Sequence, residues 1–119
     1  MNGITAYQEH RVVTQSPARL IVLLYDGAIK FLKQAIEHMQ AGDIVAKSEA
    51  VGRATEIIIE LDSVLNMEAG GEIAENLRKL YDFMARRITV AHVRNNPQML
   101  REVIKLLEDL NDGWKAVVD

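Results

Sequence analysis

The histidines are the side chains best able to bind a metal ion or move a proton near neutral pH. In helical bundles that hold two metal ions, the ligands include Glu-x-x-His pairs that project inward from two helices. The residues three positions before the histidines are Tyr7, Ala35 and Thr89, so no such pair exists here. We therefore expect no metal site, and surface or boundary positions for all three histidines, which are His10, His38 and His92.

Other patterns that support catalysis or cofactor binding are also missing from the sequence. Cysteine is absent, which excludes a cysteine nucleophile, a thiolate metal site and a disulfide, and suits a reducing compartment. There is no His-Glu-x-x-His motif and no glycine-rich phosphate loop, since the Ala-Gly-Gly at 69–71 fits a helix break better. The sequence predicts a protein that is not an enzyme and binds no cofactor.

Composition and charge narrow the class of partner. The chain has 119 residues, 49% hydrophobic and 26% charged, which is enough for one compact domain. A net charge of -3 gives no indication of a positively charged surface that could bind nucleic acid. We expect Arg86, Arg87 and Arg94 to form a solvent-exposed face. No apolar run reaches membrane-spanning length or resembles a signal peptide. We expect a cytoplasmic protein without direct membrane insertion.

Helix start and stop signals divide the chain into an arm and four helices. Ser16-Pro17 and Asn96-Pro97 are typical of an N-cap followed by the first helical residue, while Gly42 and the glycine pair at 70–71 end or break helices. The expected helices run from about 16 to 40, 44 to 65, 72 to 94 and 97 to 118. Short linkers between helices of similar length favour an all-α, antiparallel up-down-up-down four-helix bundle at 16–119, preceded by an N-terminal arm at 1–15.

Each predicted helix has an apolar core stripe, and three of the four have more apolar surface than a core requires. The helix at 16–40 has an apolar arc of roughly 180°, against the roughly 100° that is usual. The helix at 97–118 has a single stripe that includes Trp114, which we expect to be buried. The arm contains apolar residues that could cover part of this excess as a plug: Ile4, Tyr7, Val12 and Val13.

The surplus on the two middle helices forms candidate binding surfaces. On 44–65, a second row about 120° from the core contains small residues, among them Gly52, whose lack of a side chain suggests close approach by either this chain or a partner. On 72–94, Ile73, Leu77, Leu80 and Met84 begin a complete core stripe, which leaves other apolar residues outside it. The candidate surface residues are Val45, Gly52, Thr55 and Ile59 on the first helix, and Phe83, Val90 and Val93 on the second.

Several strings in this order and spacing resemble the FliS family of flagellin export chaperones. They are SPARLIVLLYDGAIKFL at 16–32, GDIVAKSEAVGRATEIIIEL at 42–61, GGEIAENLRKLYDFM at 70–84 and DGW at 112–114, together with Tyr7 in the arm. Phe83 stands where many members of the family have tyrosine. The resemblance implies a bundle in the cytosol of a flagellated bacterium that binds the disordered C-terminal segment of flagellin, prevents premature polymerisation and delivers it to the export gate.

Under this resemblance, the seven candidate surface residues would contact the client. Ile4 and Tyr7 of the arm would dock on the cytoplasmic domain of the export-gate membrane protein after the client displaces them. We expect a monomer or weak homodimer. The alternative from another class is a homodimeric structural bundle with no client, whose surplus apolar faces would pair with each other.

Overall fold

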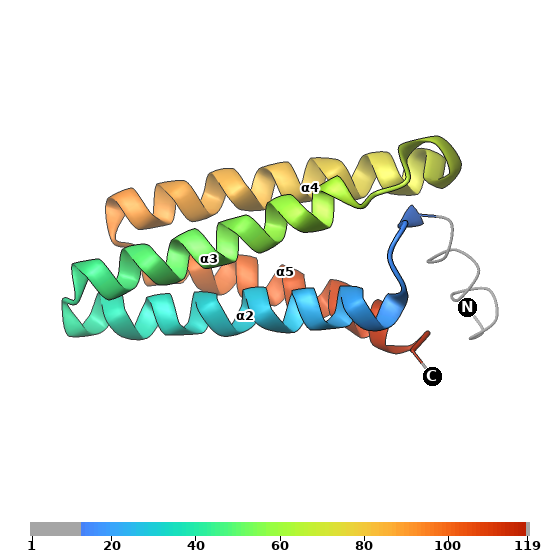
Figure 1. Cartoon of the computed structure of the whole chain (residues 1–119). Helices are drawn as coiled ribbons and strands as arrows, with labels where there is room; N and C mark the ends of the chain where they lie inside the picture. Colours follow the sequence, from blue (N-terminus) through green and yellow to red (C-terminus); the bar gives the residue numbers. More distant parts are fainter. Residues whose placement is uncertain (1–12, 119) are drawn as a thin grey trace.

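Four helices make up most of residues 13–118, the part of the chain that this computed structural model describes (Figure 1). α2 and α4 lie on opposite corners of the bundle, and each packs against both α3 and α5. Successive helices run in opposite directions because the linkers are short. The predicted all-α four-helix bundle is confirmed, and its helices are α2 Ala18–Ala41, α3 Ile44–Ser63, α4 Met67–Arg94 and α5 Pro97–Lys115.

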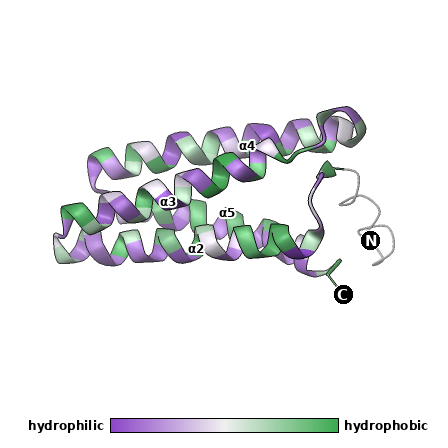
Figure 2. Ribbon diagram, viewed as in Figure 1, coloured by the Kyte–Doolittle hydropathy of each residue, from purple (hydrophilic) through white to green (hydrophobic). Residues whose placement is uncertain are grey.

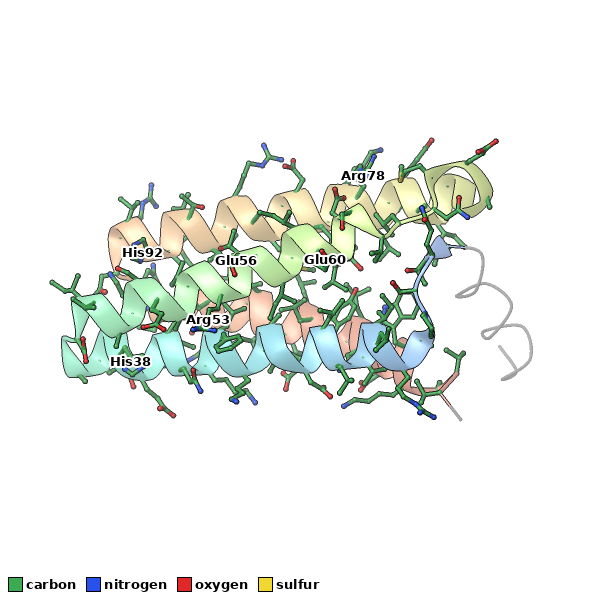
Figure 3. The ribbon with its side chains drawn as sticks, in the orientation of Figure 1. His38, Arg53, Glu56, Glu60, Arg78 and His92 are labelled. Atoms are coloured by element: carbon green, nitrogen blue, oxygen red, sulfur yellow. The ribbon has the colours of Figure 1, made fainter. Side chains whose placement is uncertain are left out.

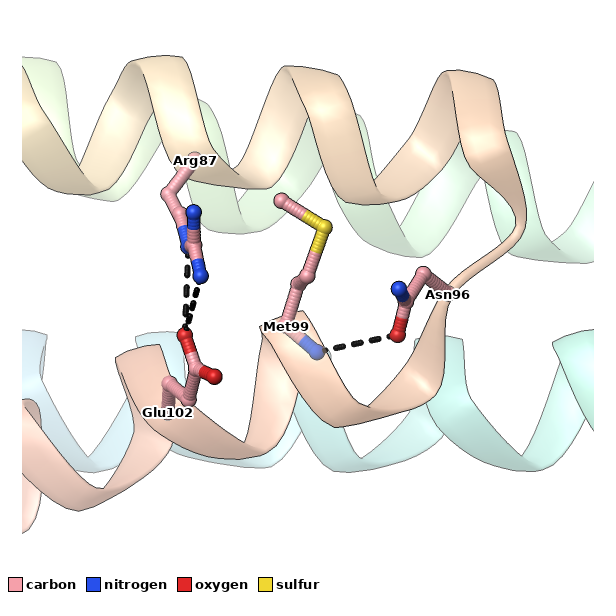
Figure 4. A network of polar contacts seen from close by, with 4 residues as sticks. All are labelled: Arg87, Asn96, Met99 and Glu102. Carbon is pink, nitrogen blue, oxygen red and sulfur yellow. Dashed lines mark hydrogen bonds and ion pairs between the residues drawn. The ribbon is translucent and has the colours of Figure 1, made fainter.

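Side-chain caps begin three of these helices. The side-chain oxygens of Asp43, Asn66 and Asn96 each accept a hydrogen bond from a backbone N–H three residues later, at 3.1, 3.0 and 3.2 Å. Figure 4 shows the cap at Asn96. The predicted cap at Ser16 is wrong: Pro17 occupies the N-cap position, and the Ser16 backbone N–H donates to the Thr14 hydroxyl oxygen at 3.2 Å. Polar side chains thus set the starts of α3, α4 and α5.

Glycines mark an end and a break, as the sequence predicts. Gly42 ends α2 in the left-handed conformation, with φ of 73°. Gly71 has φ of 52° and ψ of -131°, which interrupts α4 one turn after its start. The helix begins earlier than expected, at Met67, because Asn66 caps that first turn. Gly71 therefore joins a short turn to the long part of α4 that packs in the bundle.

The segment before α2 is fixed against the linker between α3 and α4. The Asn66 backbone N–H donates to the Val13 carbonyl, and the Gln15 N–H donates to the Val64 carbonyl, both at 2.8 Å. Val13 is buried in the main core cluster, although we predicted it as part of the arm. The other apolar residues of the predicted arm lie outside the described residues; they are Ile4, Tyr7 and Val12.

The core is built from one stripe of each helix, and hydrophobic and hydrophilic residues alternate around the ribbons in Figure 2. Trp114 is buried, as predicted, with its ring centroid 6.4 Å from that of Tyr25. On α4 the predicted stripe is partly wrong: Ile73 is 45% exposed, while Tyr81 is buried. The Tyr81 hydroxyl has a partner inside the core, which removes the usual cost of burying a polar group. The stripe also includes Ala74, and Leu80 is only half-buried.

Two glycines of different conformation give a matched test of this backbone. Replacing Gly71 by Ala should lower the free energy of unfolding by about 1–3 kcal/mol, because a Cβ atom disfavours its positive φ. Gly52→Ala should raise it by about 0.5–1 kcal/mol, since this helical glycine has nothing within 4 Å of an added Cβ. Urea unfolding of the two variants measures both effects. Equal effects of the same sign would contradict the assigned backbone conformations.

Candidate functional site

The predicted surface residues with large side chains remain uncovered within the described chain. None of them packs in the interior of residues 13–118, so this part of the chain leaves their apolar area uncovered. Gly52 is also exposed, and Thr55 is half-buried. The exposed fractions are 79% for Val45, 60% for Ile59, 45% for Phe83, 36% for Val90 and 78% for Val93.

A groove of about 410 Å³ lies between α3 and α4. The buried residues Ile58 and Tyr81 contribute to its lining, and exposed Ile59 forms part of its α3 wall. Charged residues surround the apolar lining, and an ion pair between Arg78 and Asp62, at 3.0 Å, joins the two helices there. The lining residues are Ile58, Ile59 and Asp62 from α3, and Arg78, Lys79, Tyr81, Asp82 and Ala85 from α4.

The predicted row on α3 lies on the side that faces this groove. Thr55 and Ile59 precede Asp62 by seven and three residues, so they share a helix face with the residue that contacts α4. Gly52 and Val45 continue the row toward the start of the helix. An added Cβ at Gly52 would meet nothing within 4 Å, which excludes tight internal packing as the reason for this glycine. The row is therefore an open surface.

Phe83 and Val90 lie on the other side of α4, toward α5. They stand four residues before and three residues after Arg87, whose guanidinium donates to the Glu102 carboxylate of α5 at 3.1 and 2.6 Å (Figure 4). Residues at these spacings share one face of a helix. The structure thus places six of the seven predicted residues on two surfaces, with the α3 row beside the groove and this pair on the α4/α5 side. Val93, next to the last residue of α4 and 78% exposed, belongs to neither surface.

Sequence reasoning missed part of the exposed apolar surface. The 180° arc of the first helix was the available signal, but it did not separate the side chains that the bundle covers from those it leaves out. Leu23 is 60% exposed although it was not singled out. The other large apolar residues that are exposed beyond the predicted set are Leu20, Ile44 and Ile73.

The hydroxyl groups on the two helices bordering the groove are already used within their own helices. Ser48 donates to the Ile44 carbonyl at 2.9 Å, and Thr55 donates to the Val51 carbonyl at 2.9 Å. On α4, Thr89 donates to the carbonyl four residues earlier at 3.1 Å. The hydroxyl protons of these side chains are therefore not available to a ligand.

A pair of tyrosine hydroxyls lies beneath the groove. The Tyr25 and Tyr81 oxygens are 2.6 Å apart and hydrogen-bonded to each other. Burial raises the pKa of both phenols above the ordinary value. Both rings therefore stay neutral at physiological pH, and their hydrogen bond persists across that range.

At the other end of α4, a lysine joins that helix to α3. The Lys47 ammonium donates to the His92 carbonyl at 3.2 Å and to the Asn95 side-chain oxygen at 3.1 Å. These acceptors lie at the negative end of the α4 dipole, which favours a cation. Burial, and then the charge of Lys47, lowers the pKa of His92. Figure 3 shows His92 near the end of α4 and Arg78 nearer its middle. Their contacts with Lys47 and Asp62 tie α4 to α3 near both ends of α3.

Residues 13–118 contain neither a candidate metal site nor a membrane-spanning helix. In this range no three histidine, aspartate or glutamate side chains are grouped so that they could hold a metal ion. None of the helices described is both long and apolar enough to cross a membrane. Apolar side chains, rather than a polar constellation, are therefore the main feature of the candidate site.

Comparison with known proteins gives a consistent result over the whole chain. Residues 1–119 match the protein family described as "Flagellar protein FliS". A flagellar secretion chaperone FliS from Vibrio cholerae is 42% identical over 119 residues, covering 97% of this chain and 88% of that protein. The protein of the same name from Salmonella typhimurium is 43% identical, covering 98% and 90%, and that from Bacillus subtilis is 35% identical, covering 98% and 86%.

Proposed function

The chain belongs to the FliS family of flagellar secretion chaperones, which are not enzymes, and we propose that its client is the C-terminal segment of flagellin. In this proposal the protein binds that segment in the cytoplasm, prevents its premature polymerisation and delivers it to the export gate. The observation that carries the proposal is the exposed apolar row on α3, which ends at Ile59 in the α3/α4 groove.

The energy available for binding comes from covering this row. Fully burying one side chain of the size of Val or Ile is worth about 1.5–3 kcal/mol. Val45 and Ile59 are both more than half exposed, and Gly52 between them lets a partner approach the α3 backbone closely. Covering the row therefore supplies part of the free energy that offsets the entropy lost when a disordered chain becomes ordered.

The groove favours a helical client over an extended one. An extended segment would need partners for its backbone N–H and C=O groups, since leaving them buried and unpaired is costly. The hydroxyl protons of Ser48, Thr55 and Thr89 are already donated within their own helices. A helix satisfies its own backbone groups, and the row from Val45 to Ile59 is about 21 Å long, which matches about four helical turns.

The second apolar surface calls for a client longer than one helix. Phe83 and Val90 lie on the α5 side of α4, and the α3 row lies on its other side. A long segment that crosses α4 can cover both surfaces, whereas a short one covers only one of them. In the proposal, two parts of the flagellin segment occupy these two surfaces.

Charge substitutions test the two surfaces separately. Ile59→Asp and Phe83→Asp should each weaken binding of a flagellin C-terminal peptide by about ten-fold or more, because each places a carboxylate in a contact that must lose water. Helix content and melting temperature should change little, since both side chains are exposed. Isothermal titration calorimetry and circular dichroism provide the two measurements.

Leu23→Asp is the matched control for Ile59→Asp. Leu23 is also 60% exposed, but it lies on α2, outside the proposed surfaces. The proposal predicts unchanged affinity for this variant. If Leu23→Asp weakened binding as much as Ile59→Asp, a general effect of surface charge would replace the assigned sites.

The N-terminal arm is the second part of the proposal. Residues up to Val12 cover an apolar groove in the free protein, and after displacement Ile4 and Tyr7 dock on the cytoplasmic domain of the export-gate membrane protein. Both of these residues lie outside the described part of the chain. The support is the position of the arm's base, since Val13 pairs with Asn66 in the linker that follows the Asp62 end of the groove.

A shortened chain tests the arm. Deleting residues 1–12 keeps Val13, which is part of the core, and should leave flagellin affinity unchanged or raise it. Binding to the purified cytoplasmic domain of the gate protein should be lost. A full-length variant with Ile4 and Tyr7 both changed to Ser is the control for chain length and should behave in the same way. A large loss of flagellin affinity in the shortened chain would reject the model of a displaceable arm.

A further inference from the structure

The two buried tyrosines join diagonal corners of the bundle. Tyr25 belongs to α2 and Tyr81 to α4, and these helices otherwise pack mainly against α3 and α5. Their hydroxyl oxygens are 2.6 Å apart, with ring centroids 6.4 Å apart, and both residues are buried. The contact therefore spans the core from one corner to the opposite one.

Large side chains support both ends of this contact. The Tyr25 ring also packs against Trp114 of α5, with centroids 6.4 Å apart. Tyr81 lines the α3/α4 groove together with Ile58. The groove thus coincides with the part of the core that contains three large aromatic rings.

We propose that the Tyr25–Tyr81 hydroxyl pair is a spacer that holds α4 away from α2 and so keeps the α3/α4 groove wide enough for a client helix. This inference rests on the proposed function for its biological role. Tyr25 and Tyr81 are positioning residues in this account, because the client contacts the groove that they shape. Tyr25 is itself fully buried and cannot be part of the client surface.

The physical argument depends on the oxygen atoms rather than on the rings. A short hydrogen bond between two neutral hydroxyls sets the separation of the ring ends within a narrow range. Two phenylalanines would leave a gap of about two oxygen atoms in a core that is otherwise close-packed. A helix that is free to move closes such a gap, and α4 would then shift toward α2 and narrow the groove.

Single and double substitutions separate spacing from stability. The Tyr25 hydroxyl is hydrogen-bonded to Trp114 as well as to Tyr81. Tyr25→Phe therefore removes an oxygen that two buried side chains contact, whereas Tyr81→Phe removes only one of the two partners of Tyr25. Both changes should lower the melting temperature, and Tyr25→Phe should lower it more. The double variant leaves no tyrosine hydroxyl unpaired but still lacks the oxygen that Trp114 contacts, so its melting temperature should lie between those of Tyr25→Phe and the unmodified protein. The affinity for the flagellin C-terminal peptide should not return, and should stay about ten-fold below that of the unmodified protein.

Val103→Ala is the control for a destabilised core. Val103 is fully buried on α5 and does not line the groove, so this variant should melt at a lower temperature but bind the peptide with unchanged affinity. Full affinity in the Tyr25→Phe/Tyr81→Phe double variant would overturn the proposal that the tyrosine pair acts as a spacer. Loss of affinity in Val103→Ala equal to that in the double variant would do the same, because general loosening of the core would then explain both.

A crystal structure of the double variant tests the spacer without any client. The proposal predicts a smaller separation of α2 and α4 and a groove smaller than about 410 Å³. An unchanged groove would overturn the inference and leave the proposed function intact. If the unmodified protein failed to bind the peptide while the groove narrowed in the double variant, the proposed client would be wrong and the spacer itself would stand.

Discussion

A four-helix bundle can bury only one face of each helix, and the rest of this structure depends on that limit. The core here is completed by residues such as Ile58, Met84 and Leu107, which are almost fully buried. Apolar residues beyond these stripes have no position left inside, and Val45 and Ile59 remain largely exposed. Their exposure to water is unfavourable, so burying them against a partner contributes favourable free energy to binding.

The character of the groove follows from how its polar groups are satisfied. Hydroxyls beside it donate within their own helices, and Lys47 and Arg78 use their charges to join α3 to α4. Such a surface offers apolar contacts but no new hydrogen bonds to a partner's backbone. A helical partner can bind it at little cost, because its own backbone groups are already hydrogen-bonded. Recognition in this account depends on shape and apolar area, with the buried tyrosine pair maintaining the width of the groove.

Much of the fold was predictable from local signals in the sequence. Asn96 caps α5 as predicted, and Gly71 breaks α4 where a glycine pair stands, but the cap at Asn66, which starts α4 earlier than expected, was not predicted. Burial was less predictable when it depended on distant residues. Tyr81 is buried because Tyr25, 56 positions earlier, supplies its hydrogen-bond partner. No helical periodicity contains that information.

The exposure of the candidate residues was predictable, but their division between two surfaces was not. An apolar residue outside the core stripe is visible from the 3.6-residue period, which identified Ile59 and Phe83 as surplus. Ile59 of α3 and Phe83 of α4 lie on different sides of α4, and this depends on which neighbouring helix each face meets. That information comes only from contacts such as Arg87 with Glu102.

The most direct measurement is methyl NMR of protein with labelled isoleucine and valine side chains, titrated with a flagellin C-terminal peptide. The account predicts that the Val45 and Ile59 methyl signals shift on binding while those of fully buried Ile88 and Val103 change little. Binding that leaves the Val45 and Ile59 signals in place would contradict it.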